Sequence, residues 1–384
     1  MIGKSDTSKK DLYQIALYFS SKGIVKDIQL ISSGNINNTY LVRCSEDSCF
    51  EIFILQTINT RVFSSPIALI NNHLIFLDYI QEIENNRSDL EHIHLTFPRL
   101  LLNSYSNDYL LKYKEKSWRA FEFVPQSKTI LCLSSSKQAY EVGKALGAFH
   151  SLSHSFPLHK LSKSIDSLHS FGNHLSNFYN TIQNKTCKQN SQEELKNRVD
   201  TIISFIKNNK DKVINIDSLF ISPPLSFGLI HGDTKSANFL FDELSDQILS
   251  IIDMDTIQSG YLIYDIADCC RSCCNQSGEE PKDTDLINFD LIIFGSILKG
   301  YLLYSDKLLN KNDLKYLPAT IYSITFELAI RFFTDYLSGD TYFETTYPKQ
   351  NLFRAEVQLA LLQDIQQKWE DIKEIVTSLA SDLN

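Results

Sequence analysis

The first third of the chain alternates between short apolar runs and clusters of turn-forming residues. Three runs rich in β-branched and aromatic residues come first, followed by a helical pattern that begins at Pro66 and reaches about Ile83. Three more β-rich runs then follow, with the sequences FPRLLLN, DYLLKY and SWRAFEFV. The first three predicted strands are 27–32, 39–44 and 49–55. The pattern predicts a short helix at 8–21, then a mostly antiparallel sheet with one long helix inserted after its third strand.

The hydrophobic period changes after residue 127. Serine caps open a helical pattern in SSSKQAYEVGKALGAFHSLSHSF, and further helical patterns occupy about 164–182 and 191–209. The stretch FGLIHGDTKSANFLFDELSDQILSIIDMDT then predicts strand, loop, strand, turn and strand, and helices follow almost to the end. We therefore expect an α+β bilobal protein. It has a small antiparallel sheet lobe at 1–124, a hinge at 125–128 and a large helical lobe at 129–384.

Composition and charge narrow the class of protein. The 384 residues are 43% hydrophobic and 22% charged, which is typical of a soluble globular protein. The formal net charge of −9 argues against a general nucleic-acid binder, although it leaves room for a small phosphorylated ligand. The beginning of the chain lacks a secretory signal, and the most apolar stretch, FDLIIFGSILKGYLLY, is interrupted by Asp290 and Lys299. We expect a cytoplasmic protein without a membrane partner, and the sequence indicates no oligomeric state.

Eight cysteines are present, and four of them form the run CCRSCC at 269–274. A secreted disulfide scaffold would be shorter and denser in cysteine, so the protein is expected to be reduced. A metal site would need a second Cys or His pair at ligand spacing. On a helix these thiols share a stripe, which favours small buried side chains over a metal centre.

The stretch IHGDTKSANFLF places several chemically active groups in the predicted hairpin. Asn238 follows Asp233 by five residues, and Asp253 ends the apolar strand SIID. The spacing H-x-D-x-x-x-x-N, followed by a hydrophobic strand ending in Asp, is typical of the catalytic and metal loops of kinases. Asp233 is then the catalytic base, Asn238 and Asp253 are Mg²⁺ ligands, and Lys235 contacts the transferred phosphate. The alternative interpretation, a simple polar turn, does not explain an aspartate at the end of each of two apolar strands.

The chain resembles the aminoglycoside-phosphotransferase-like small-molecule kinases, which have a bilobal protein-kinase-like fold, and more narrowly the N-acetylhexosamine 1-kinases. The resemblance is spread over most of the chain, although 160–220 has no counterpart. It implies ATP- and Mg²⁺-dependent phosphorylation of the anomeric (C1) hydroxyl of a hexosamine-type sugar. The stretches that carry it are SGNINNTYLV at 33–42, LQTINTRVFSSPIALINN at 55–72, HGDTKSANFLFD at 231–242, SIIDMDTIQSGYLIYDIADCCR at 250–271 and IRFFTDYLSGDTYF at 330–343.

The resemblance also implies where ATP binds. The turn with Gly34 and Asn35 would lie over the phosphates, and Phe123 and Val124 belong to the segment that would contact adenine. A plain β-turn and a plain linker are the alternative interpretations of these two segments. Kinases of this fold usually carry a lysine or arginine on the third strand, where this chain has Gln56. That departure puts the phosphate contacts in doubt, with Arg61 or Lys235 as candidate substitutes.

Substrate contacts are expected from both lobes. Asn37 is expected to face ATP or the sugar, and Asp255 the metal or the sugar, beside the base Asp233. Arg331 and Asp335 are spaced as an (i, i+4) pair, and the resemblance favours sugar binding over a simple surface ion pair.

Two rival functions stay open at this point. The first is a kinase with another hydroxyl acceptor, such as an aminoglycoside, choline or homoserine, for which a strongly acidic acceptor site is expected. The second is a non-catalytic pseudokinase, which Gln56 favours and the intact Asp233, Asn238 and Asp253 oppose. His150, in KALGAFHSL, is interpreted as a helix residue that is satisfied locally.

Overall fold

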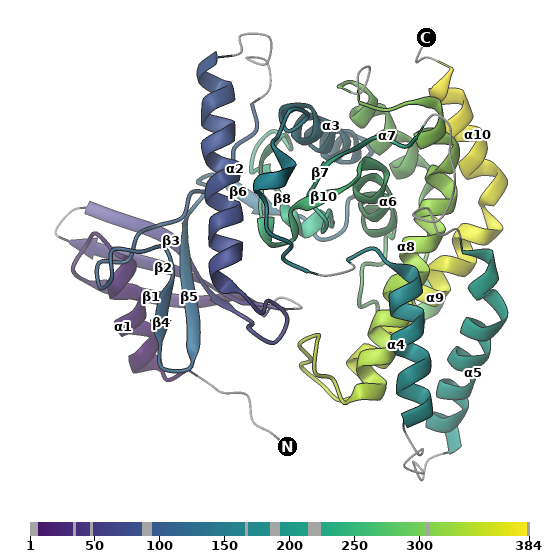
Figure 1. Ribbon diagram of the computed structural model, residues 1–384, viewed down its shortest axis with the longest axis horizontal. Coiled ribbons are helices and arrows are strands. Elements are labelled where there is room, and N and C mark those ends of the chain that lie inside the picture. The colour runs from purple at the N-terminus through teal and green to yellow at the C-terminus, as the bar shows by residue number, and fades with distance from the viewer. Residues whose placement is uncertain are drawn as a thin grey trace.

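A sheet lobe and a larger helical lobe lie on either side of helix α2 (Pro66–Asn86) in the computed structural model (Figure 1). The structure describes residues 7–33, 36–46, 49–86, 94–165, 168–184, 193–213, 224–304 and 308–381. The expected α+β bilobal architecture is confirmed.

The sheet lobe is one antiparallel sheet with the strand order β1-β2-β3-β5-β4. Helix α1 (Lys9–Phe19) covers one face, where Ile15 and Phe19 meet Phe53 and Trp118 in a buried apolar cluster. The period-2 pattern of the first three runs therefore predicted these strands correctly. The strands are β1 (Val25–Ser33), β2 (Asn38–Glu46), β3 (Cys49–Ile58), β4 (Leu111–Tyr113) and β5 (Lys116–Glu122).

The strand expected at FPRLLLN is wrong. Among the described residues there, Leu100 and Asn103 form isolated bridges, with Phe121 of β5 and with Asp108 respectively, and no continuous strand is present. Pro98 has no N–H to donate to a ladder, and its carbonyl oxygen instead lies 2.9 Å from Nε2 of His73 on α2. The segment follows the sheet edge without joining it as a strand.

Helix α2 contributes to the cores of both lobes. Near its start, Leu69 and Ile70 pack with residues of the sheet lobe in one apolar cluster. About two to three turns later, Phe76 and Ile80 are buried in the main core with Phe149 of the helical lobe. The helix therefore packs against the apolar cores of both lobes.

In its described residues, the helical lobe contains two small sheets among eight α-helices. β8 pairs with both β6 and β9, and β7 pairs with β10, so the predicted strand–loop–strand–turn–strand pattern is confirmed. The strands are β6 (Ser127–Thr129), β7 (Phe227–Ile230), β8 (Phe239–Asp242), β9 (Ile248–Ile251) and β10 (Gln258–Tyr261). The α-helices are α3 (Ser136–Leu152), α4 (Phe171–Asn184), α5 (Glu193–Asn209), α6 (Leu262–Cys273), α7 (Leu291–Leu302), α8 (Lys311–Ser338), α9 (Gln350–Gln367) and the C-terminal α10 (Trp369–Ala380), of which α4 and α5 extend beside α8 and α9 (Figure 1).

Helices α3 and α7 touch backbone to backbone. A Cβ on Gly143 would lie 1.9 Å from the carbonyl oxygen of Ile297, and one on Gly300 would lie 2.0 Å from that of Tyr140. Only glycine fits at these crossings, because any side chain would collide with rigid backbone. The close approach fixes α3 against α7 and so sets the position of the last turn of α3.

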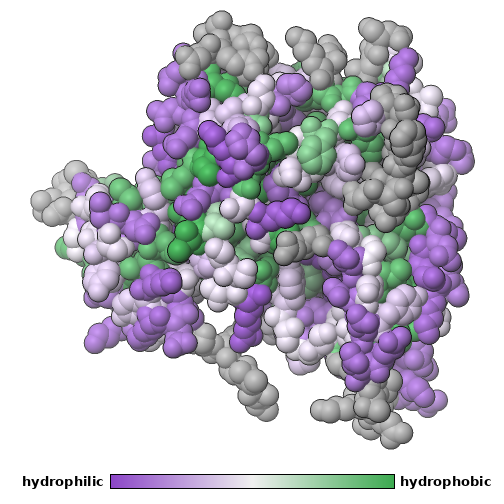
Figure 2. All heavy atoms as spheres, viewed as in Figure 1, coloured by the Kyte–Doolittle hydropathy of each residue, from purple (hydrophilic) through white to green (hydrophobic). Residues whose placement is uncertain are grey.

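The remaining sequence expectations concern the cysteines and the surface. Cys269, Cys270, Cys273 and Cys274 are free and buried on α6, as the sequence predicts. Across the described ranges, no group of three or more His, Cys, Asp or Glu side chains is arranged to hold a metal ion. Within the same ranges, no helix has the length and apolarity needed to cross a bilayer. Hydrophilic side chains cover much of the outer edge of the helical lobe in Figure 2.

Candidate active site

The loop between β7 and β8 carries Asp233, and its backbone path is tightly constrained. Nε2 of the buried His231 lies 3.0 Å from the carbonyl oxygen of Ile252, which ties the loop to the end of β9. Gly232 has φ of +80°, and a Cβ there would lie 2.8 Å from the carbonyl oxygen of Thr256. Glycine is therefore required at this position. The loop presents Asp233 in one orientation.

Two aspartates of α6 hold this loop by accepting hydrogen bonds from its backbone. The carboxylate of Asp265 accepts hydrogen bonds from the backbone N–H groups of His231 (2.6 Å) and Gly232 (2.8 Å). Asp268 accepts from the N–H of Thr234 at 3.1 Å. Burial raises the pKa of Asp265, but the hydrogen bonds and charges of His150 and His231 together lower it by more, so the pKa lies below its usual value. The group stays an acceptor for the loop.

His150 is not satisfied locally, which corrects the expectation from sequence. Its Nε2 lies 3.0 Å from Asp265 and its Nδ1 2.8 Å from the hydroxyl of Tyr301 on α7. The close crossing of α3 and α7 brings these groups together. His150 thus belongs to the support of the catalytic loop.

Asp233 is surrounded by groups that stabilise its negative charge. Nζ of Lys235 forms an ion pair with it, and Nδ2 of Asn238 donates to its carboxylate at 3.0 Å. Burial alone would raise the pKa of Asp233, but the charge and hydrogen bond of Lys235 outweigh that effect, and the pKa is lowered. Asp233 is therefore ionised at neutral pH. The same ion pair, together with Asp253, raises the pKa of Lys235 despite its burial.

The backbone just before Asp253 pairs with Asn238 across the hairpin. The N–H of Ile252 donates to the carbonyl oxygen of Asn238 at 2.9 Å, so Asp253 follows directly on the paired residues. Its backbone is left-handed, with φ of 65°. Burial, and next the charge of Asp255, raise its pKa to about 6. Crowded carboxylates of this kind favour a bound cation.

Asp255 differs from Asp253 because its carboxylate already forms an ion pair with an arginine. Its carboxylate lies 2.6 Å from both Nη1 and Nη2 of Arg119 on β5, and Nδ2 of Asn37 donates to it at 3.0 Å. Gln56, on β3 directly opposite Arg119, accepts from Nε of that guanidinium at 3.0 Å. We refer to Asn37, Gln56, Arg119 and Asp255 as the Arg119 network. It joins the sheet lobe to the turn that carries Asp253.

The other residues expected near ATP are less constrained. Gly34 and Asn35 lie outside the described residues. Phe123 and Val124 follow the end of β5 and are half-buried, and the carbonyl oxygen of Val124 accepts from Ser127 at 2.7 Å. Arg61, one candidate substitute for the third-strand cation, is exposed.

Arg331 and Asp335 lie on α8 with separate partners. The carboxylate of Asp335 accepts from the backbone N–H groups of Thr341, Tyr342 and Phe343, at 2.8–2.9 Å. It therefore orders the turn after α8 rather than bracing Arg331. The guanidinium of Arg331 lies instead over the rings of Tyr342 and Phe343.

A second polar group of residues lies beside the catalytic loop. His169 and His174 both approach the buried carboxylate of Glu327, at 3.8 and 3.6 Å. Arg331 lies one turn further along α8 and adds a positive charge. Burial is the main cause of the lowered pKa of His174, and the charge of Arg331 lowers it further. We call His169, His174, Glu327 and Arg331 the Glu327 cluster.

The Glu327 cluster is close to the catalytic loop through two contacts. Leu168, the neighbour of His169, has its Cδ2 2.7 Å from where a Cβ on Gly232 would lie. The ring of His169 also lies 4.9 Å from that of Tyr264, which precedes Asp265 on α6. Within the described residues, neither ring nitrogen of the buried His169 has a hydrogen-bond partner. Buried polar atoms without partners are rare and are suited to binding a ligand.

Sequence reasoning missed Arg119, Asp265 and Asp268 as functional residues. Their signal is a charged residue within an otherwise apolar element: Arg119 interrupts the strand SWRAFEF, and the two aspartates interrupt the apolar helix α6. Buried charges are rare unless they are paired. Such positions identify candidates, although not their partners.

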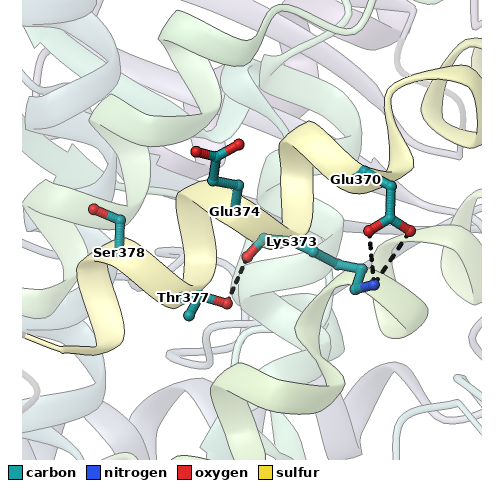
Figure 3. A pocket seen from close by; sticks show the side chains of 5 residues that line it. All are labelled: Glu370, Lys373, Glu374, Thr377 and Ser378. Atoms are coloured by element: carbon teal, nitrogen blue, oxygen red, sulfur yellow. Dashed lines mark hydrogen bonds and ion pairs between the residues drawn. The ribbon is translucent and has the colours of Figure 1, made fainter.

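A surface hollow elsewhere has no connection to this chemistry. It lies along α10 and is lined by Glu370, Lys373, Glu374, Thr377 and Ser378 (Figure 3). The charged groups Lys373 and Glu370 pair with each other on the same helix at 2.9 Å. Its lining is a solvated helix face, which needs no ligand.

Comparison with known proteins agrees with the fold and with the kinase-like loops. Three solved structures match nearly the whole chain. A microcompartment-associated aminopropanol kinase has 15% identity, TM-score 0.59 and coverage of 95% of this chain and 99% of its own. An aminoglycoside phosphotransferase from Alicyclobacillus acidocaldarius has 14% identity, TM-score 0.54 and coverage of 99% and 98%. A spectinomycin phosphotransferase solved with ADP and spectinomycin has 15% identity, TM-score 0.52 and coverage of 98% and 99%.

At these identities the structures establish the kinase-like fold alone. The sequence itself matches a family over residues 27–289, a range that covers more than half of the chain and contains Asp233, Asn238 and Asp253. That family is described as the phosphotransferase enzyme family. The chain belongs to this phosphotransferase enzyme family and is a small-molecule phosphotransferase with the aminoglycoside-phosphotransferase-like fold.

Proposed function

We propose that this phosphotransferase transfers the γ-phosphoryl group of ATP to the anomeric hydroxyl of an N-acetylhexosamine-type sugar. The observation that carries the proposal is the Glu327 cluster, a set of buried and half-buried planar polar groups next to the loop of Asp233. The chemistry of the loop supports the transfer step, and the charge of the cluster supports the class of acceptor.

Asp233 is suited to act as the base. Its lowered pKa keeps it ionised at neutral pH, ready to accept the proton of an attacking hydroxyl. Asn238 holds its carboxylate in place, and the contacts of Asp265 fix the loop. Lys235, which pairs with Asp233 here, would neutralise charge on the transferred phosphoryl group.

The residues around Asp253 fit Mg²⁺ held together with ATP. Asp253 and Asn238 offer hard oxygen ligands from opposite sides of the hairpin. Burial, and next the charge of Asp255, raise the pKa of Asp253, so a bound cation would stabilise its buried negative charge. When bound, the metal would neutralise the phosphate oxygens during transfer. Two protein ligands suffice, because Mg²⁺ usually takes its remaining ligands from phosphates and water.

The Glu327 cluster favours a neutral polyhydroxyl acceptor. Glu327 brings one negative charge and Arg331 one positive charge, while burial lowers the pKa of His174 and keeps that imidazole neutral. A polycationic acceptor would call for an excess of carboxylates at this place. Asp335 does not supply one, since backbone N–H groups occupy it. Imidazole, carboxylate and guanidinium groups together match the hydroxyls and the amide of an N-acetylhexosamine.

The test is ADP release with a panel of reducing sugars, Mg²⁺ and ATP. We expect turnover with an N-acetylhexosamine and a sugar 1-phosphate product in the phosphorus NMR spectrum. The methyl glycoside of the same sugar is the control, because its C1 hydroxyl is blocked. Turnover of the glycoside would show that another hydroxyl accepts the phosphoryl group, which would contradict the proposal.

Rival acceptors are tested in the same assay. Turnover of an aminoglycoside, choline, homoserine or aminopropanol, with none of the sugars, would replace the proposed acceptor. Binding of Mg·ADP without turnover of any acceptor would support a pseudokinase.

Substitution of Arg331 tests binding of the sugar acceptor separately from binding of the nucleotide. Arg331→Gln is expected to raise KM for the sugar about tenfold or more, because a charged hydrogen bond contributes roughly 1.5–3 kcal/mol. The affinity for Mg·ADP should not change. Arg198→Gln, which removes an arginine paired with Glu356 at 2.6 Å in the same lobe, is the matched control. Equal effects of the two variants on KM would remove Arg331 from the acceptor site.

A further inference from the structure

Strand β3 lacks the cation that kinases of this fold use near the phosphates, and the adjacent strand supplies one. The register of the sheet places Gln56 of β3 directly opposite Arg119 of β5. Both side chains lie on the same face, because directly opposed residues on neighbouring strands share a face. A positive charge is therefore present one strand, about 5 Å, from its usual place.

Gln56 is arranged to support that charge. Its Oε1 accepts from Nε and Nη2 of Arg119, at 3.0 and 2.6 Å, while its Nε2 donates to Thr39 of β2 at 3.0 Å. A lysine at the position of Gln56 would repel Arg119, whereas the amide oxygen attracts it. The glutamine on β3 and the arginine on β5 thus form one unit.

Arg119 is too deeply buried to reach out to a phosphate. Its side chain is 1% exposed, and its fork is occupied by Gln56 on one side and by the Asp255 carboxylate on the other. Both Nη atoms lie 2.6 Å from Asp255 oxygens. Arg119 therefore acts through other residues.

The partner of Arg119 determines what it acts upon. Asp255 lies two residues after Asp253, in the 3-10 turn Met254–Thr256 of the helical lobe. Asn37, just before β2, donates to the same carboxylate at 3.0 Å and accepts from the N–H of Asn59 after β3. Asp255 is thus held by the beginning of β2 and by β5 simultaneously.

We propose that Arg119 is the positioning residue that takes over from the third-strand lysine, by fixing the Asp253 turn to the sheet lobe through Asp255 and Gln56. In protein kinases the corresponding lysine pairs with a glutamate inside the small lobe. Here the ion pair crosses between the lobes. It sets the distance between the strands that face the nucleotide and the carboxylate expected to hold its metal.

The experiment measures Mg·ADP affinity by calorimetry and thermal unfolding without nucleotide. The variants are Arg119→Gln, Arg119→Lys and the double variant Gln56→Lys/Arg119→Gln, which returns a cation to β3. Arg43→Gln is the matched control, because Arg43 is an exposed arginine of the same sheet paired with Asp27. These measurements need no acceptor, so they test the nucleotide side of the proposed function and leave the identity of the sugar untouched.

We expect Arg119→Gln to weaken Mg·ADP binding about 10- to 100-fold, the range typical of residues that position metal ligands. Arg119→Lys should fall between it and the wild type, because an ammonium cannot bridge Gln56 and Asp255 as a fork does. The double variant should recover part of the affinity. Arg43→Gln should bind like the wild type.

Two results would overturn the proposal. One is wild-type affinity for Mg·ADP in Arg119→Gln. The other is a double variant that unfolds like the wild type yet binds as weakly as Arg119→Gln, since Arg119 would then not be replacing the function of a cation on β3. If Arg119→Gln does not fold, Arg119→Lys provides the test. Wild-type affinity of Arg119→Lys for Mg·ADP would then overturn the proposal.

Discussion

The loop that carries Asp233 and the turn that carries Asp253 lie on one hairpin but are held by different parts of the molecule. Asp265 and Asp268 of α6 fix the first from within the helical lobe. Arg119 of the sheet lobe holds the second through Asp255. A movement of the sheet lobe should therefore displace the nucleotide and metal side of the site while leaving the base in place. The residues expected to act as base and as metal ligand are thus supported mainly from different elements, α6 and β5.

The largest expected effect comes from the base. Asp233→Asn should lower turnover about a thousandfold, because general base catalysis contributes roughly 10²–10⁴-fold. Mg·ADP affinity should stay near that of the wild type, as measured by calorimetry. A variant that keeps full turnover would show that another group accepts the proton.

The support of the loop is expected to matter less than the base. Asp265→Asn replaces one of the two carboxylate oxygens that accept from the N–H groups of His231 and Gly232 with an NH2 group, which cannot accept, so kcat should fall about 10- to 100-fold. The affinity for Mg·ADP should change little, in contrast to Arg119→Gln. Asp242→Asn, the same change in the β8–β9 turn, is the control. A comparable loss of Mg·ADP affinity in Asp265→Asn would show that the two supports are not separate.

The smallest effect is on stability and concerns Asp253. Its folded-state pKa is raised from 3.8 to about 6, so the folded protein binds that proton more tightly than the unfolded chain. The stabilisation is complete below pH of about 4 and is lost as the pH rises through about 6. In metal-free protein at pH 7.5, Asp253→Asn should therefore raise the Tm by a few degrees, and asparagine also tolerates the left-handed backbone there.

The difference in Tm between this variant and the wild type should shrink from pH 7.5 to pH 5, where the wild-type carboxyl is protonated. Thermal unfolding in a chelator checks this. A constant difference across that range would mean that the raised pKa of the buried Asp253 carboxyl is not its cause. The variant should lose turnover, because the carboxylate that destabilises the fold is the one expected to hold the metal.

The sequence predicted local features better than contacts between distant strands. The placement of Asp233, Asn238 and Asp253 around one hairpin was predicted correctly because their spacing and the period-2 strands around them are local features. The pairing of Gln56 with Arg119 joins residues 63 positions apart and depends on strand register, which a single sequence does not specify.

Helical spacing also predicted the wrong partner for Asp335, because backbone N–H groups compete with Arg331 for its carboxylate. Arg331 and Asp335 are spaced to pair along α8, but the helix ends at Ser338 and the chain turns back through Gly339 at φ of 92°. That turn brings three backbone N–H groups to the Asp335 carboxylate, and together they satisfy it better than one guanidinium at the surface.

Helix α2 has a consequence for how the chain can be divided. A fragment that ends at residue 124 would retain α2 but strip Phe76 and Ile80 of the partners that bury them, at about 1.5–3 kcal/mol each. The remainder, from 125 onward, would carry an open groove where those side chains had been. We therefore expect neither half to be stable when expressed alone. The lobes look like two domains in outline, but they share one helix and should melt in a single transition.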